Sequence, residues 1–128
     1  MTPINISDKF TKFSEQWSPR RVVLVDEMQV ILARLQGEFV WHSHEEEDEL
    51  FHVIKGTLYM QFRDASSEDG IKTVVVKEGE IIVVPKGVEH NPTTKNGEEV
   101  QVLLFEKLST AHTGKVVHER TKTDYPLI

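Results

Sequence analysis

The sequence lacks cysteine altogether among its 128 residues, which excludes disulfide bonds, thiolate zinc sites, iron–sulfur clusters and cysteine nucleophiles. It has no apolar run near the ~20 residues that a transmembrane helix needs. Its first ten residues, MTPINISDKF, are too polar for a secretory signal peptide. Positive charge is also scarce, because 15 Lys and Arg face 21 Asp and Glu, for a net charge of -6. We therefore expect a cytoplasmic protein with no nucleic-acid and no membrane partner.

What the chain does contain is typical of one globular domain. Apolar residues make up 38% and charged residues 28%, which is enough apolar material to exclude wholesale disorder. A globule of this length buries roughly two-thirds of the surface that its unfolded chain exposes. The chain can thus form a core without covalent or metal crosslinks.

The N-terminal segment, residues 1–20, has the period of a helix rather than of a strand. A short amphipathic helix is predicted from about Ser7 to Gln16, with Asn5 or Ser7 as its N-cap and Pro19 ending it. Its apolar face predicts packing on the core or contact with a dimer partner. That face consists of Ile6, Phe10, Phe13 and Trp17.

From Arg21 onward, short β-prone runs alternate with turn residues, which indicates an all-β domain over residues 21–108. The runs are RVVLV, QVILARL, EFVWH, LFHVI, TLYMQF, KTVVV, EIIVV and VQVLLF. No segment is long enough for the helical crossovers of a parallel sheet, so the patterns leave a sandwich or a barrel. Residues 109–128 are polar, and we expect them to form a tail that packs on this domain.

The chemistry-bearing residues gather in the stretch from His42 to Glu49. On a strand, His42 and His44 share one face with Cα atoms ~6.6 Å apart, close enough for two imidazoles to meet at one ion. Strand parity puts Glu49 on the face opposite to His52. Taken alone, the pair could also be two half-exposed strand residues beside a solvated acidic turn or a loose cation trap.

Two spaced motifs resemble those of the cupin family. The first is His42-x-His44, four residues, Glu49, six residues and a glycine, and the second runs from Gly79 through Pro85-x-Gly87 to His90. The resemblance implies a double-stranded β-helix, or jelly-roll, barrel. It also implies that four residues are metal ligands, namely His42, His44, Glu49 and His90.

The sequence departs from the cupin pattern at two positions. Gly37 stands one residue closer to His42 than is usual, and Thr94 replaces an asparagine. Neither position is a ligand in the family pattern. The shortened spacer puts only the start of the strand in doubt.

The donor set supports the same chemistry on physical grounds. Three neutral imidazoles and one carboxylate suit a divalent transition metal ion, and in an octahedral ion they leave two positions open. They do not select among Mn, Fe, Ni and Zn. Pro85 and Gly87 suit a turn that returns His90 to the barrel mouth.

Two classes of function follow, with a small-molecule ligand in both. One is a metalloenzyme of the dioxygenase, isomerase or epimerase, or lyase type; sugar-phosphate-isomerase-like activity would rest on shared fold alone. The other is a non-catalytic ligand-binding or sensing module, and a metal-silent scaffold is a third reading. We also expect a homodimer, because the edge strands of a small jelly roll invite pairing.

The remaining charged and histidine residues are expected to play smaller parts. An anionic substrate could be held by Arg34, Arg63 or Lys86, although solvated surface charge is the simpler interpretation. His52 is expected to be structural or interfacial. His112 and His118 lie in the polar tail and are expected to be solvated or turn residues.

Overall fold

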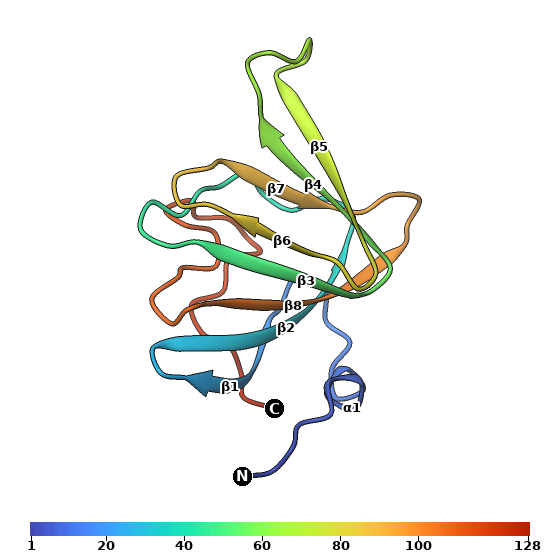
Figure 1. The fold of residues 1–128 in the computed structure, drawn as a ribbon, viewed down its shortest axis with the longest axis vertical. Helices are drawn as coiled ribbons and strands as arrows, with labels where there is room; N and C mark the ends of the chain where they lie inside the picture. The colour runs from blue at the N-terminus through green and yellow to red at the C-terminus, as the bar shows by residue number, and fades with distance from the viewer.

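The strands form two antiparallel sheets in the computed structural model, which describes residues 1–128. The elements are α1 (Ile6–Phe10), β1 (Arg20–Val25), β2 (Met28–Gln36), β3 (Glu49–Lys55), β4 (Thr57–Arg63), β5 (Ile71–Lys77), β6 (Ile81–Val84), β7 (His90–Thr93) and β8 (Glu99–Lys107). One sheet has the order β1-β2-β8-β3-β6 and the other β5-β4-β7 (Figure 1). The predicted all-β jelly roll is confirmed.

The core lies between the sheets because inward and outward side chains alternate along the strands. On β8, Val100, Val102 and Leu104 are buried, and on β3 the same holds for Phe51 and Val53. β8 is the central strand of the larger sheet, pairing with β2 on one side and β3 on the other. Residues on its inner face therefore lie deep in the barrel. No helix of the structure is long and apolar enough to cross a membrane.

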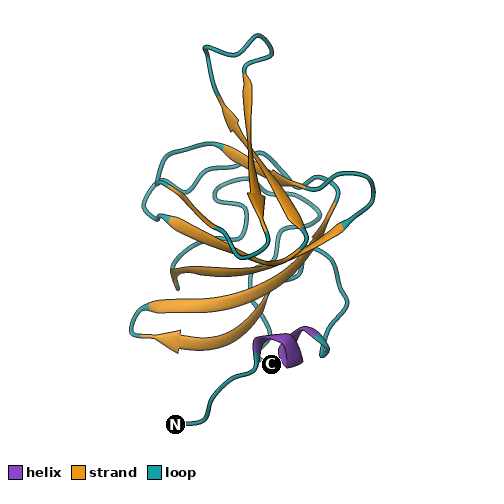
Figure 2. Ribbon diagram, turned by 45° about the vertical axis from the view of Figure 1, so that its right-hand side comes forward, coloured by secondary structure: helices purple, strands orange, loops and turns teal.

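The N-terminal helix forms but is shorter than predicted. It begins at Ile6, with the Asn5 side chain accepting a hydrogen bond from the backbone N–H of Asp8 at 2.9 Å, and it ends at Phe10. From Phe10 onward the chain bonds to β2 instead: the Arg34 guanidinium donates to the carbonyl of Phe10 at 2.6 Å, and Trp17 donates its backbone N–H to the carbonyl of Arg34 at 2.9 Å. Figure 2 shows the helix against the barrel, near the C-terminus. Three residues of the predicted apolar face are buried in their own chain, namely Phe10 in the helix and Phe13 and Trp17 after it, so this face is not free for a dimer partner.

Two strand assignments were wrong. The run EFVWH, residues 38–42, is not a strand, since it makes only isolated bridges from Glu38 to Thr93 and from His42 to His90. Phe39 and Val40 both pack inward, which breaks the two-residue period. Conversely, residues 90–93 form β7 although Pro92 lies inside it. Pro92 is tolerated because β7 is an edge strand of its sheet, with β4 as its one neighbouring strand.

Residues 109–128 contain no regular strand but are held against the barrel. Thr113 and Tyr125 are buried. The backbone N–H of Arg21 donates to the carbonyl of Pro126 at 2.9 Å, and that of Ile128 donates to Arg21 at 3.0 Å. These contacts hold the end of the tail against β1.

Candidate metal centre

Four side chains from separate parts of the sequence meet inside the barrel, namely His42, His44, Glu49 and His90. One ligand atom from each lies within 4.8 Å of the others. All four are buried, with exposed fractions of 0 to 5%. Glu49 Oε1 is 3.3 Å from His90 Nε2 and 3.6 Å from His44 Nε2. The structure thus brings together every residue that the sequence proposes as a ligand.

The backbone and the inner hydrogen bonds orient two of the imidazoles. His42 and His90 form an antiparallel bridge, with backbone N–H···O distances of 3.0 and 2.8 Å. His42 Nδ1 lies 2.8 Å from the carbonyl of Val40, and His90 Nδ1 lies 2.9 Å from that of Val88. A carbonyl only accepts, so each Nδ1 carries the proton and each Nε2 keeps its lone pair.

Several donor atoms of the cluster have no hydrogen-bond partner within the protein. His44 Nδ1 and Nε2, Glu49 Oε1 and His90 Nε2 are buried without a hydrogen-bond partner, although buried polar atoms are nearly always paired. Unprotonated nitrogens beside a carboxylate oxygen repel one another and attract a cation. The donor set and its unmet polar atoms therefore fit a divalent transition metal ion.

The charge states of these groups suit the same role. Burial, helped by nearby His90, lowers the pKa of His42 to about 4, so this imidazole is neutral at pH 7. Burial on its own raises the pKa of Glu49, but the neighbouring imidazoles of His44 and His90 outweigh it and bring that pKa below its ordinary value. A charged carboxylate beside neutral imidazoles is what metal binding requires.

The turn between β6 and β7, which leads to His90, is hydrogen-bonded to the segment that carries His44 and Glu49. Gly87 has a φ of +82°, which a side chain would strain, and its N–H donates to the carbonyl of His44 at 2.8 Å. The neighbouring Lys86 N–H donates to the carboxylate of Asp48 at 2.9 Å. Asp48 is therefore engaged on the surface, whereas Glu49 faces the cluster.

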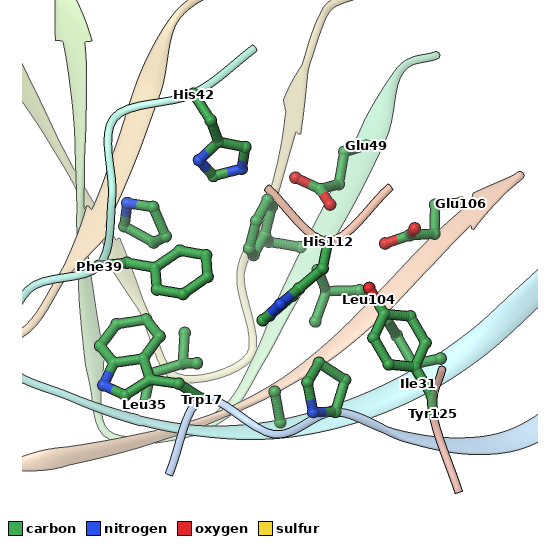
Figure 3. A pocket seen from close by; sticks show the side chains of 14 residues that line it. Trp17, Ile31, Leu35, Phe39, His42, Glu49, Leu104, Glu106, His112 and Tyr125 are labelled. Atoms are coloured by element: carbon green, nitrogen blue, oxygen red, sulfur yellow. The ribbon is translucent and has the colours of Figure 1, made fainter. Parts of the chain in front are cut away.

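A cavity of about 40 Å³ continues from the cluster into the barrel (Figure 3). His42 and Glu49 form part of its wall, and the rest is mostly apolar. Trp17 stacks on Phe39 there, with ring centroids 4.7 Å apart. By the volume that an ordered water needs, the cavity has room for roughly three waters. The centre therefore opens onto a small, largely apolar chamber.

Sequence analysis missed three polar residues of this chamber, which are Glu106, His112 and Tyr125. His112 lies in a turn, as one of its two predicted alternatives has it, but its ring is not solvated: it is half-buried in the cavity, 5.0 Å from that of Phe39. No local pattern marks His112 or Tyr125. They reach the cavity only because the tail folds back over the barrel.

Glu106 could have been found from strand parity. It follows Val102 and Leu104 on the inner face of β8 and pairs across the sheet with Glu49. Gln29 donates to it from 3.4 Å. Burial, reinforced by the charge of Glu49, holds the pKa of Glu106 well above its ordinary value. This second carboxyl is 2% exposed and lies at the inner end of the cavity wall.

The cationic residues named as anion binders lie elsewhere. Arg34 pairs with Glu99 at 2.6 Å, and Arg63 pairs with Glu89 at 2.7 Å. Lys86 is exposed on the turn. No Lys or Arg lines the cavity. His52 is half-buried on the outward side of β3 and His118 is exposed, both in line with expectation.

Comparison with known proteins identifies the family. The model of the cupin domain matches residues 29–106, which is more than half of the chain. The chain is a cupin. Its fold is shared with a cupin-2 domain containing protein from Shewanella frigidimarina, at 41% identity over 81% of this chain and 93% of that one, with a TM-score of 0.73. Protein NMB1881 from Neisseria meningitidis matches at 28% identity over 83% of this cupin and 99% of that chain, with a TM-score of 0.70.

Curated relatives are longer than this cupin. An acireductone dioxygenase from Vitis vinifera is 30% identical over 72% of this chain and 49% of its own length. The uncharacterized protein YdbB of Bacillus subtilis is 39% identical over 48% of this chain and 49% of its own. The chain thus spans about half the length of these two relatives.

The two departures from the usual cupin motif contact each other. The N–H of Gly37 donates to Thr94 Oγ1 at 2.7 Å, and the N–H of Thr94 donates to the carbonyl of Gly37 at 2.8 Å. Gly37 has a φ of +88°. The shortened spacer is thereby joined to the end of β7, and the placement of His42 is kept.

Proposed function

We propose that this cupin is a metalloenzyme that binds a divalent transition metal ion and acts on a small organic molecule in the barrel cavity. The ligands in this proposal are His42, His44, Glu49 and His90. The observation that carries it is the group of buried, unpartnered donor atoms in the wall of a cavity. A purely structural ion would be closed in by protein on all sides, whereas this centre faces a chamber.

The protein residues around the centre have distinct parts in this proposal. A bound ion would supply Lewis acidity or one-electron chemistry next to the cavity. Trp17 and Phe39 form an apolar wall that limits water and holds the carbon skeleton of the substrate. Glu106 places a second carboxyl near Glu49, in reach of proton exchange with a bound molecule.

Among the reaction types, dioxygenation has the most support. The likeness to an acireductone dioxygenase extends over 72% of this chain, while the isomerase, epimerase and lyase alternatives rest on fold alone. The lack of a Lys or Arg side chain in the cavity wall also disfavours sugar phosphates, whose phosphate group carries charge beyond what the ion binds. The native metal remains one of Mn, Fe, Ni and Zn in this proposal.

The test begins with metal analysis of protein purified without chelator and without a nickel affinity tag. Oxygen consumption is then measured with a panel of small organic substrates. We expect about one metal ion per chain and substrate-dependent oxygen uptake that His44→Ala abolishes. The matched control His52→Ala replaces an outward histidine of β3 and should keep both.

The outcome separates the two classes of function. Metal binding together with saturable ligand binding, but without turnover under any condition, would favour the non-catalytic binding or sensing module. Protein that takes up none of the four metals would contradict the proposal and leave the metal-silent scaffold.

A further inference from the structure

The cavity is completed by a segment outside the part of the chain that matches the cupin domain. That match ends at residue 106, and residues 109–128 follow it as a wall fixed in place. Thr113 is fully buried and donates its hydroxyl to the carbonyl of Val116 at 2.6 Å. Gly114 lies against the carbonyl of Ser43, between the two proposed histidine ligands, where a Cβ would overlap that oxygen. The segment thus packs directly on the metal centre.

His112 is the polar side chain that this wall contributes to the cavity. Its ring lies between those of Phe39 and Tyr125, at centroid distances of 5.0 and 5.8 Å (Figure 3). Its Nδ1 accepts a hydrogen bond from the backbone N–H of Lys122 at 2.9 Å. The accepting nitrogen has no proton, so in the neutral ring the proton is on Nε2. His112 therefore presents one N–H donor.

The protonation of the ring agrees with this geometry. Burial, together with the charge of Lys122 and the nearby His44, lowers the pKa of His112 to about 4, although Glu49 acts in the opposite direction. At neutral pH the ring is uncharged. A neutral donor recognises an acceptor oxygen without demanding a negative charge on it.

The rest of the wall defines the ligand class by its charges. It contains two carboxyl groups, Glu49 and Glu106, and no Lys or Arg. Most of the remaining wall is apolar, including Trp17 and Phe39. The part of a ligand that enters the ion-free cavity is thus uncharged, because an anion there would face the Glu49 carboxylate without a Lys or Arg as counter-charge. The volume of about 40 Å³ compares with roughly 150 Å³ for a cavity that takes benzene, so this part has only a few non-hydrogen atoms.

We propose that His112 is a ligand-binding residue of the cavity, and that its Nε2–H donates to the carbonyl oxygen of a small uncharged compound. The inference rests on the proposed function only in placing this compound beside a metal ion. Binding in the cavity itself needs no ion, so the two claims can fail separately.

The probe is acetone, an uncharged ketone of four non-hydrogen atoms, with acetate as the anion of the same size. Each is titrated into ¹⁵N-labelled, chelator-treated protein while the histidine side-chain nitrogens are followed by NMR. We expect His112 to be protonated on Nε2 at neutral pH. Acetone should shift this signal saturably, and acetate should bind at least ~5-fold more weakly.

Variants test the donor itself. His112→Phe keeps an aromatic ring between Phe39 and Tyr125 but removes the N–H, and should weaken acetone binding at least ~5-fold. His112→Gln retains a donor and should recover part of the loss. His118→Phe makes the same change at an exposed histidine of the same segment and should leave acetone binding unchanged.

Several results would overturn the inference. These are a proton on Nδ1 of His112, equal binding of acetate and acetone, and unchanged acetone binding in His112→Phe. If His112→Phe fails to fold in a thermal melt, the wild-type titration and His112→Gln decide. A parallel Zn²⁺ titration separates the two claims. If acetone binds through His112 but Zn²⁺ does not bind, only the proposed function is contradicted. If Zn²⁺ binds but acetone has no effect, only this inference is contradicted.

Discussion

Replacing Glu49 with glutamine removes the only negative charge among the four clustered donors while keeping the size of the side chain. Glu49 is 5% exposed, so solvent screens its charge weakly. Two unit charges 4 Å apart interact by about 4 kcal/mol at an effective dielectric constant near 20. The amide oxygen of glutamine is uncharged but can still bind the ion, so the variant would keep part of this binding energy. We expect the dissociation constant for Zn²⁺ to rise at least ~10-fold, or ~1.4 kcal/mol.

The neighbouring carboxylates provide matched controls. Asp48 accepts the N–H of Lys86 at the surface, and in Asp48→Asn the amide oxygen can still accept it. The Debye length at physiological ionic strength is about 8 Å. At that distance in water, a surface charge changes the binding free energy of a divalent ion by only ~0.4 kcal/mol, or about twofold in affinity. Asp48→Asn and Glu46→Gln should therefore change Zn²⁺ affinity by about twofold at most.

Isothermal titration calorimetry of Zn²⁺ into the three variants decides the assignment. Circular dichroism melts of the metal-free proteins check that each variant is folded. Equal affinities for Glu49→Gln and Asp48→Asn would refute the assignment of Glu49. Similar small losses in all three variants would point instead to a diffuse cation trap on the acidic turn.

Four further predictions concern stability and assembly. Burial lowers the pKa of His42 and His112 to about 4, so the unfolded chain binds more protons at these two groups below pH 6.5, while the raised pKa of Glu106 acts in the opposite direction as a single group. The metal-free protein should therefore lose stability as the pH falls from about 6.5 to 4, and the loss should be larger in Glu106→Gln. Urea midpoints that stay flat over this range in Glu106→Gln would contradict the burial of both rings. Thermal melts with and without chelator should differ near neutral pH and converge below about pH 5, since protons compete with the ion; identical melts at neutral pH, after verified metal removal, would count against metal binding. Gly114→Ala should lower the free energy of unfolding, measured in urea, by at least ~2 kcal/mol more than Gly70→Ala does. Both glycines have a positive φ, but of the two only Gly114 lies where a Cβ would overlap the backbone. Equal losses in the two variants would show that the tail is not packed on Ser43. Finally, we expect a homodimer, now on the basis of exposed apolar residues of β1 and β6, and sedimentation showing only monomer at tens of micromolar would exclude it.

The burial of His42, His44 and Glu49 on one side of the chain was predictable because it depends on local rules. The two-residue period puts His42 and His44 on one face, and the same parity separates Glu49 from His52. Residues 38–42 form no regular strand, but burial still alternates from His42 to His44. Both histidines are buried, and Ser43 between them is only half-buried. The motif spacing that brings His90 to the cluster came from the cupin resemblance.

The rest of the cavity was not predictable because long-range contacts create it. His112 and Tyr125 look like residues of a polar tail, and only the packing of that tail on the barrel places them beside Phe39. The short helix is a further case, since its last residue, Phe10, accepts a hydrogen bond from Arg34 on β2, a contact that no local pattern predicts. Glu106 is the exception, since its inward position follows from the alternation along β8.

Anomalous diffraction from crystals grown with Zn²⁺ or Mn²⁺ tests most directly whether the buried cluster is a metal site. Data collected on either side of the absorption edge locate the ion independently of the refined protein. We predict a single strong peak bounded by His42, His44, Glu49 and His90. A peak on the acidic turn from Glu45 to Asp48, or no peak with metal in excess, would contradict that assignment.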